Sequence, residues 1–251
     1  MSVLRFIILA TSGALLLSSC HKDPAVAPQG DGWVRLQMIP EWEGAPFQAF
    51  TEQQNISGYR VQVELVRFYL SNIRLIQGSG YSQLTEVNLF DLTNGPIEMI
   101  LPADGGNWSG LNMGLGVTEQ LNHSDPVLYA NDHPLSASNG MHWDWTMGYI
   151  FTKFEGRHDT IPGSNGAFPN TFSIHTGFDT AYVNIDLQPS LPIQVVDGDT
   201  TTITVRVAID SFFHSDEGGT IDLADEYLSH GMNVPLSMKL SRNVAESFTI
   251  D

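Results

Sequence analysis

Short segments in which apolar and polar residues alternate are the feature that most restricts how this chain can fold. Alternation extends through Trp33–Ile39, the start of Tyr59–Ile76, Thr85–Leu92, Ala181–Gln188 and Thr200–Phe213. Side chains of a β-strand point alternately to its two faces, so each segment predicts a half-buried strand. Turn residues such as Asn94-Gly95-Pro96 follow the strands. We therefore expect an all-β fold, a single β-sandwich-like domain of antiparallel strands with long loops.

Several elements are predicted in more detail. The second half of Tyr59–Ile76 is compatible with a strand or with a short helical turn followed by a strand. Asp197–Asp199 reads Asp-Gly-Asp and predicts a hairpin turn between the strands on either side of it. Asp222–Gly231 has an acidic start and a glycine stop, so it predicts one short helix near the C-terminus. Pro235–Ser241 alternates and predicts another strand.

The N-terminal residues indicate export and lipid anchoring. Residues 1–19 carry an early basic residue and an apolar run, the layout of a lipoprotein signal peptide, too short for a membrane span. Leu17-Ser18-Ser19-Cys20 resembles a lipobox, and Cys20, the one cysteine in the chain, stands at the position that is lipidated. Residues 20–32 are polar with proline and glycine and predict a flexible tether. The domain over 33–251 is thus expected at a bacterial envelope, as an outer-membrane or periplasm-facing lipoprotein.

Charge and cysteine usage exclude some functions. The formal net charge is −17, which argues against nucleic acid as a partner because such binding needs a basic face. It suits a soluble protein and could attract cations or a basic partner. With no cysteine after Cys20, the domain has no disulfide and no thiolate site, so a metal would be held by other donors.

The segment Gly140–Gly156, GMHWDWTMGYIFTKFEG, gathers aromatic and soft side chains. Its composition predicts a strand over Met141–Phe154. Strand alternation would place Met141, Trp143, Trp145, Met147 and Tyr149 on one face, and His142, Asp144 and Thr146 on the other. Such a face could be sandwich core, since aromatic residues dominate cores. Yet each buried indole N–H needs a partner, which makes a tryptophan pair a poor choice for filling a core.

This segment resembles the signature of the MbnP-like family of bacterial copper-binding envelope proteins, through its Met-x-Trp-x-Trp-x-x-Gly-Tyr core. Weaker similarity, in the same order, covers nearly all of the mature chain and includes the following segments: VRLQMIPEWEGAPF, FYLSNIRL, FSIHTGFD and RNVAESFTID. The family includes copper proteins of methanotrophs and lipoproteins of Bacteroidota-type bacteria.

The resemblance implies a copper site. Characterised members bind copper through histidines and through kynurenine, which an MbnH-like diheme cytochrome peroxidase makes from a tryptophan. Here it implies Trp143 or Trp145 as the ligand precursor and copper, Cu(I) or Cu(II), as the metal. The metal-ligand candidates are His175, His142 and His133, with Met141 and Met147 as soft neighbours. Family ligand histidines lie two positions from the modified tryptophan, whereas His142 lies one and three positions away; in a strand only a bulge would bring these groups together.

Three function classes remain open from the sequence. The first is a copper-binding lipoprotein for uptake, storage or delivery, without catalysis of its own. The second is an interaction or carbohydrate-binding lipoprotein with a platform of Trp108, Trp143 and Trp145. The third, a hydrolase, lacks support because the chain contains neither Gly-x-Ser-x-Gly nor His-Glu-x-x-His.

Overall fold

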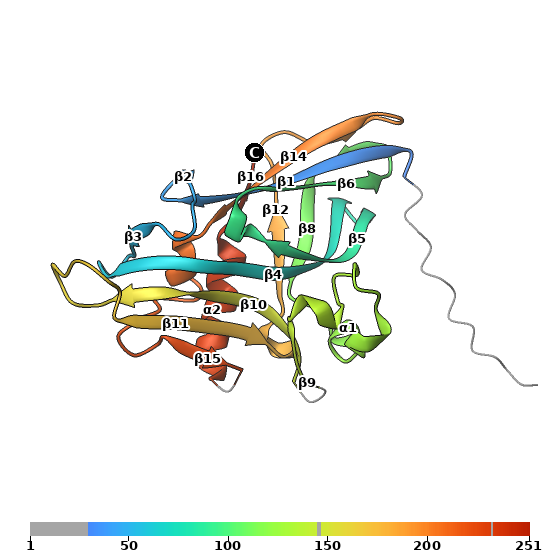
Figure 1. Cartoon of the computed structure of the whole chain (residues 1–251). Helices are drawn as coiled ribbons and strands as arrows, with labels where there is room; N and C mark the ends of the chain where they lie inside the picture. Colours follow the sequence, from blue (N-terminus) through green and yellow to red (C-terminus); the bar gives the residue numbers. More distant parts are fainter. Residues whose placement is uncertain (1–29, 145–146, 232) are drawn as a thin grey trace, which may run out of the picture.

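The computed structural model describes residues 30–144, 147–231 and 233–251. Strands are the main regular structure of this chain and form two large sheets whose buried faces share one core, with a helix near the C-terminus (Figure 1). The all-β, β-sandwich-like prediction is confirmed. The predicted signal peptide and Cys20 lie outside the described residues, as does most of the predicted tether. None of the helices in the described part is long and apolar enough to cross a membrane.

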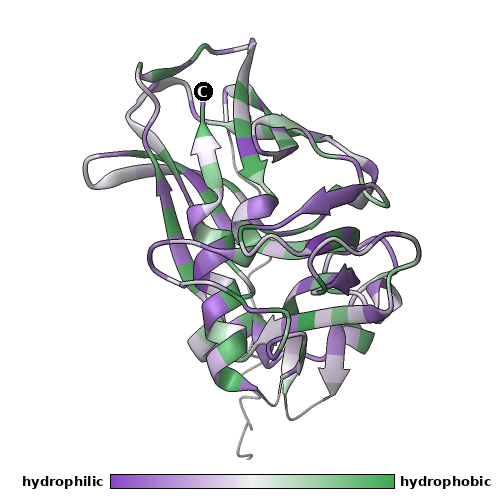
Figure 2. Cartoon of the chain, turned by 90° about the vertical axis from the view of Figure 1, so that its left-hand side faces the viewer, coloured by the Kyte–Doolittle hydropathy of each residue, from purple (hydrophilic) through white to green (hydrophobic). Residues whose placement is uncertain are grey.

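The smaller of the two large sheets is built around β1 and follows the order β16-β14-β1-β2, with β6 also paired to β1. Its strands are β1 (Gly32–Trp42), β2 (Ala45–Pro46), β6 (Ile97–Ala103), β14 (Thr200–Ala208) and β16 (Phe248–Ile250). In β1 every second residue is buried, as the alternation predicts, and Figure 2 shows hydrophobic and hydrophilic residues alternating along strands. The β1–β14 pair is parallel, which differs from the expected antiparallel arrangement.

The larger sheet follows the order β12-β8-β4-β10-β11-β15, with β3 and β5 also paired to β4 and β9 to β10. Its strands are β3 (Glu52–Gln54), β4 (Arg60–Gln77), β5 (Gly80–Asp91), β8 (Gly110–Leu115), β9 (His142–Asp144), β10 (Gly148–Asp159), β11 (Asn170–Gly177), β12 (Val183–Leu187) and β15 (Leu228–His230). The β11–β15 pair is also parallel. A separate small sheet joins β7 (Gly106–Trp108) to β13 (Ile193–Val195).

The long strand β4 settles the open question about residues 59–76. It remains a strand throughout, pairing with β10 in its first half and with β8 in its second. Register shifts occur next to Asn72, which has φ 50°. Asparagine tolerates this left-handed conformation better than most residues, so the irregularity falls where the chain accepts it.

The predicted hairpin at Asp197–Asp199 is wrong. Gly198 makes a turn with φ 75°, but the preceding strand is β13, and β12 and β14 belong to different sheets. Turn chemistry identifies a reversal in the chain but not the strands that then pair across it.

The two predictions for residues 222–241 are wrong in opposite senses. Asp222–Gly231 forms a turn followed by β15, whereas the helix is α2 (Val234–Glu246) and includes the predicted strand Pro235–Ser241. Asn233 caps α2 by accepting a hydrogen bond from the Leu236 backbone, and a proline lies in its first turn. The helix buries Leu236, Leu240 and Val244, whose spacing of four residues is helical.

The other helical elements are short. They are α1 (Glu119–Asn122) and the single 3-10 turns η1 (Leu92–Asn94), η2 (Pro126–Leu128), η3 (Ala137–Asn139), η4 (Asp179–Ala181) and η5 (Asp210–Phe213). The main core lies between the two large sheets and α2. A second, smaller cluster includes Tyr69, Met141 and Tyr149 and lies beside the loops around α1.

Candidate metal-binding site

The tryptophan segment is a strand pair and not the single strand expected over Met141–Phe154. Strand β9 pairs antiparallel with β10, with Asp144 opposite Gly148 and His142 opposite Tyr149. Gly148 has φ 74°, and an added Cβ would lie 2.5 Å from the Asn122 Oδ1 atom, so glycine is required there. The reversal invalidates an alternation argument that runs across residues 141–154.

Trp143 lies over the ends of β11 and β15. A Cβ atom added to Gly177 would approach Trp143 Cζ3 to 2.3 Å, and one added to Gly231 would approach Cη2 to 3.2 Å. The ring centroid of Phe178 is 5.7 Å from that of Trp143. Two glycines therefore leave the space that the indole occupies.

His175 shares this side of β11. It lies two residues before Gly177 in the same strand, so its side chain leaves the face on which the Trp143 ring covers Gly177. The alternating residues Phe172 and Ile174 are in the core, which confirms that His175 points away from it. In a strand, positions i and i+2 are about 6–7 Å apart, so imidazole and indole are near neighbours.

A carboxylate orients the His175 ring. His175 Nε2 is 2.6 Å from Glu155 Oε1, and because a carboxylate only accepts hydrogen bonds, Nε2 carries the proton. In the neutral ring the lone pair is then on Nδ1. This bond also holds the pKa of Glu155 below its usual range. A histidine held by a carboxylate on one nitrogen, with the lone pair on the other, matches the usual arrangement around metal-ligating histidines.

His230 is the second imidazole at this position. The parallel register places it beside His175, and the two rings stack with centroids 4.6 Å apart and planes at 23°. Its Nε2 is 2.9 Å from Ser173 Oγ, which is also 3.2 Å from His175 Nε2. Burial lowers the pKa of His230, and the neighbouring His175 lowers it further. The ring is thus neutral at pH 7, the form in which imidazole binds metals.

The other two candidate histidines have different ring contacts. His142 packs edge-on against Tyr149, with ring centroids 4.8 Å apart. His133 stacks on Tyr129 at 4.2 Å, and its Nδ1 accepts a hydrogen bond from the Leu135 backbone. The structure therefore brings His175 together with His230, and does not bring it together with His133.

The soft neighbours and the other tryptophans are placed as follows. Met141 is buried in the smaller core cluster, and Met147 is half-buried. Trp145 lies outside the described residues. Trp108 is in β7, packs against the main core and donates its Nε1–H to the Asp104 carbonyl, whereas Trp143 packs against the smaller cluster. A joint platform of Trp108 and Trp143 is therefore not seen.

Sequence reasoning missed His230, Glu155 and the two glycines. One signal was available, because both histidines are closely followed by glycine, in His175-Thr176-Gly177 and His230-Gly231. The contact itself depends on the parallel β11–β15 pair, which links positions 55 residues apart in sequence and which no local pattern announces.

Fold and site together define a β-sandwich-like protein that holds a histidine pair and a tryptophan at one edge of its larger sheet. A family model for MbnP matches residues 31–234, and the chain belongs to the MbnP family.

Among solved structures, the chain is similar to MbnP from Methylosinus trichosporium. The two share 14% sequence identity with a TM-score of 0.49, over 72% of this chain and 77% of that one. The search of curated proteins gave no match.

The donor set is compatible with copper but short of protein ligands. Imidazole is a good copper ligand, and the site holds two imidazole rings. Across the described ranges, no group of three or more His, Cys, Asp or Glu side chains could hold a metal ion. Two imidazoles are therefore available, and a third donor would have to come from another kind of side chain.

Proposed function

We propose that this protein binds copper at the bacterial envelope through His175, His230 and a ligand derived from Trp143. The observation that carries the proposal is the convergence of these three side chains at the ends of β11 and β15. Membership of the MbnP family supports it, since the resemblance implies copper binding. We assign the chain a role in copper acquisition or homeostasis, anchored through Cys20, and no catalytic reaction of its own.

The third ligand would be made by oxidation. Indole has no lone pair in the ring plane to offer a metal, whereas kynurenine carries an aromatic amine. Cleavage of the indole C2–C3 bond adds two oxygen atoms, which an MbnH-like diheme peroxidase would take from two molecules of hydrogen peroxide, with release of two of water. Hydrolysis of the formyl group then releases formate and leaves the amine. Trp143 is half-buried, and the exposed His230 lies next to it, so a partner could approach this edge.

Copper binding would rearrange the histidine pair. The in-plane lone pairs of two stacked rings run side by side and do not converge on one atom. One ring must therefore rotate, and His230 is the exposed member. Rotation would break its contact with Ser173 and leave the His175–Glu155 pair intact.

The test compares copper affinity and peptide mass in matched variants, each produced with and without the peroxidase partner. His175→Ala and His230→Ala should lose tight copper binding, whereas His133→Ala, a matched imidazole elsewhere, should retain it. The peptide that contains Trp143 should show the mass of kynurenine only when the partner is present. Unchanged affinity in both site variants would overturn the assignment of the ligands, and modification of Trp145 instead would move the third ligand to that residue.

Glu155→Gln tests the orienting role of the carboxylate. Glutamine preserves the shape but can donate a hydrogen bond, so it no longer fixes the proton on His175 Nε2. We expect copper affinity about 10–100-fold weaker, the usual loss when a partner of a ligand histidine is changed. Glu64→Gln, which disturbs the Arg157 ion pair on the same sheet, is the control and should leave affinity unchanged.

A further inference from the structure

A second candidate site lies at the far end of the β10–β11 pair, where β10 ends and β11 begins. A cavity of about 380 Å³ is lined there by His158, Asn170 and Tyr227, among other residues. Small-molecule sites commonly enclose about 300–1,000 Å³, so this volume suits a small ligand. The cavity involves none of the residues of the metal-binding site.

His158 is a polar residue at an inward-facing position of β10. Along β10, alternation puts Phe154, Gly156 and His158 on the inward face, and Phe154 belongs to the core. An apolar residue would therefore suit position 158. The His158 side chain is 3% exposed, and neither of its ring nitrogens has a hydrogen-bond partner among the residues that the structure describes.

The buried ring nitrogens of His158, without hydrogen-bond partners among the described residues, lower the stability of the fold. Leaving a buried polar atom without a partner costs about 1–3 kcal/mol, and such groups in native proteins commonly mark a functional position or a ligand. Burial also lowers the pKa of His158, and this outweighs the nearby Thr171 backbone, which favours the charged form. The ring is thus neutral, with one hydrogen-bond donor and one acceptor. Both nitrogens are enclosed by protein, so the ring must turn toward the cavity to reach a ligand there.

One wall of the cavity is held by Arg60. The loop 160–169 contributes Thr160 and Pro169 to the lining. Arg60 donates to Ser164 Oγ at 3.3 Å and to the Gly166 carbonyl at 2.8 Å, and lies over the Phe168 ring at 4.6 Å.

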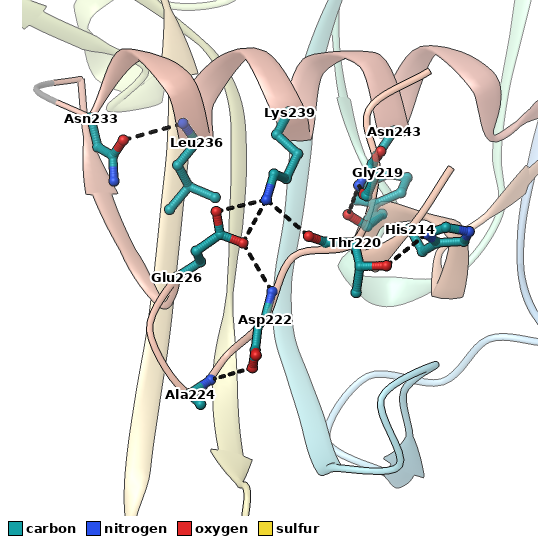
Figure 3. Close-up of polar contacts among 11 residues, drawn as sticks. His214, Gly219, Thr220, Asp222, Ala224, Glu226, Asn233, Leu236, Lys239 and Asn243 are labelled. Atoms are coloured by element: carbon teal, nitrogen blue, oxygen red, sulfur yellow. Dashed lines mark hydrogen bonds and ion pairs between the residues drawn. The ribbon is translucent and has the colours of Figure 1, made fainter. Parts of the chain in front are cut away.

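The opposite wall is held by α2. Leu223, Ala224 and Tyr227 line it, and Figure 3 shows how their loop is fixed. Lys239 Nζ contacts both Glu226 oxygens, at 2.6 and 2.7 Å, and the Asp222 backbone donates to Glu226. Both walls are therefore fixed before any ligand arrives, which reduces the entropy cost of binding.

The chemistry of the lining selects the ligand class. An anion is disfavoured by the neutral ring, by nearby Asp222 and Asp225, and by the net charge of −17. A transition metal would find one imidazole and otherwise only hydroxyl and amide groups. Hydroxyl groups of a ligand both donate and accept, which matches imidazole, amide and threonine. Tyr227, stacked on His158 with centroids 5.9 Å apart, adds an aromatic wall.

We propose that this cavity binds an uncharged sugar unit, with His158 and Asn170 hydrogen bonding to its hydroxyl groups and Tyr227 forming the apolar side. The proposal is independent of the copper site, since no residue is shared. It also differs from a tryptophan platform, because no tryptophan is among the described residues that line this cavity.

The test is a titration followed by NMR of the histidine rings. Glucose, galactose and N-acetylglucosamine, with their trisaccharides, are the probes, and glucuronate and copper are the ligand controls. At least one uncharged sugar should shift the His158 signals in a saturable way, while glucuronate should not. A trisaccharide that binds tenfold more tightly than its monosaccharide would identify a glycan chain as the source of the unit.

Variants separate binding from folding. His158→Phe fills the same inward position with an apolar ring, and Asn170→Ala and Tyr227→Ala change exposed side chains. Each should weaken sugar binding at least tenfold, while Tyr81→Ala, an exposed tyrosine on another strand, should not. The proposal is overturned if no probe sugar shifts the His158 signals, or if His158→Phe, folded as judged by its thermal midpoint, binds the sugar as well as the natural protein does.

Discussion

At the residue scale, the packing of Trp143 shows how glycine residues leave space for a large side chain. Gly177 is needed because any side chain there would enter the space of the indole. Gly231, with φ 82°, satisfies a backbone requirement as well as a steric one. The space for the Trp143 ring thus depends on two glycines, which have no side chain. This explains why the sequence around them gives little indication of the site.

Gly177→Ala tests the steric requirement for glycine beside Trp143. The added methyl group would lie 2.3 Å from Trp143 Cζ3 and 2.8 Å from the Tyr149 carbonyl, so the indole must move. We expect a loss of about 1–3 kcal/mol in the free energy of unfolding, the usual cost of overpacking. Urea denaturation measures it. Gly80→Ala is the control and should cost much less, because the atom nearest to the added Cβ is 3.4 Å away. Equal losses of stability in the two variants would argue against a steric requirement for glycine at position 177.

His158 should make stability depend on pH. Burial lowers the pKa of the folded ring below 6.5, so the unfolded chain takes up the proton first. The free energy of unfolding should therefore fall as the pH drops below about 6.5, until the pKa of the folded ring is passed. The free energy of unfolding is measured against pH for the natural protein and for His158→Phe. The difference between the two curves isolates the contribution of His158. A flat difference between pH 7 and pH 5 would show that the ring titrates alike in both states.

At the element scale, α2 fastens the loop 214–226 to the sandwich. Lys239 bonds to Glu226 and to the Thr220 carbonyl, and Asn243 bonds to the carbonyls of Phe212 and Gly219 (Figure 3). These contacts take the place of regular secondary structure in the loop. The helix therefore positions one wall of the cavity as well as filling the core.

Lys239→Met should loosen this loop. Methionine keeps most of the length of the side chain but loses the bonds from a charged donor. Each such bond is worth about 1.5–3 kcal/mol when buried and less at the partial exposure found here. We expect a loss of about 1–2 kcal/mol in unfolding free energy and faster proteolysis within 214–226. Arg242→Met, on the same helix but without an ion pair among the described residues, is the control. Equal protease resistance in both variants would contradict the fastening role.

The sequence predicts where the strands lie better than it predicts which strands pair with each other. Alternation located β1, β4, β5, β12 and β14, because one buried face leaves a period of two. It misled at Leu236, Met238 and Leu240, since a few alternating residues also fit a helix, and the cap at Asn233 was the better guide. His175 was named from its segment, but His230 was not, because the contact arises from a long-range parallel pair.

At the scale of the whole molecule, the net charge of −17 should speed the capture of copper ions by the proposed site. A negative field raises the local concentration of cations and hence the association rate. Because salt shortens the reach of the field from about 30 Å at 0.01 M to about 8 Å at 0.15 M, the rate should fall steeply between these conditions. Stopped-flow mixing with copper measures it. A rate independent of salt would show that capture depends on the site alone.

The position of β1 has a mechanical consequence. This strand follows the N-terminal segment directly and lies between β14 on one side and β6 on the other, with long ladders to both. A pull from the N-terminal side of Gly32 runs along the strand and loads both ladders in shear, so many bonds must break together and not one after another. A protein tethered through its N-terminus would then resist tension at β1, and the proposed copper and sugar sites, on the other sheet, would be spared the deformation.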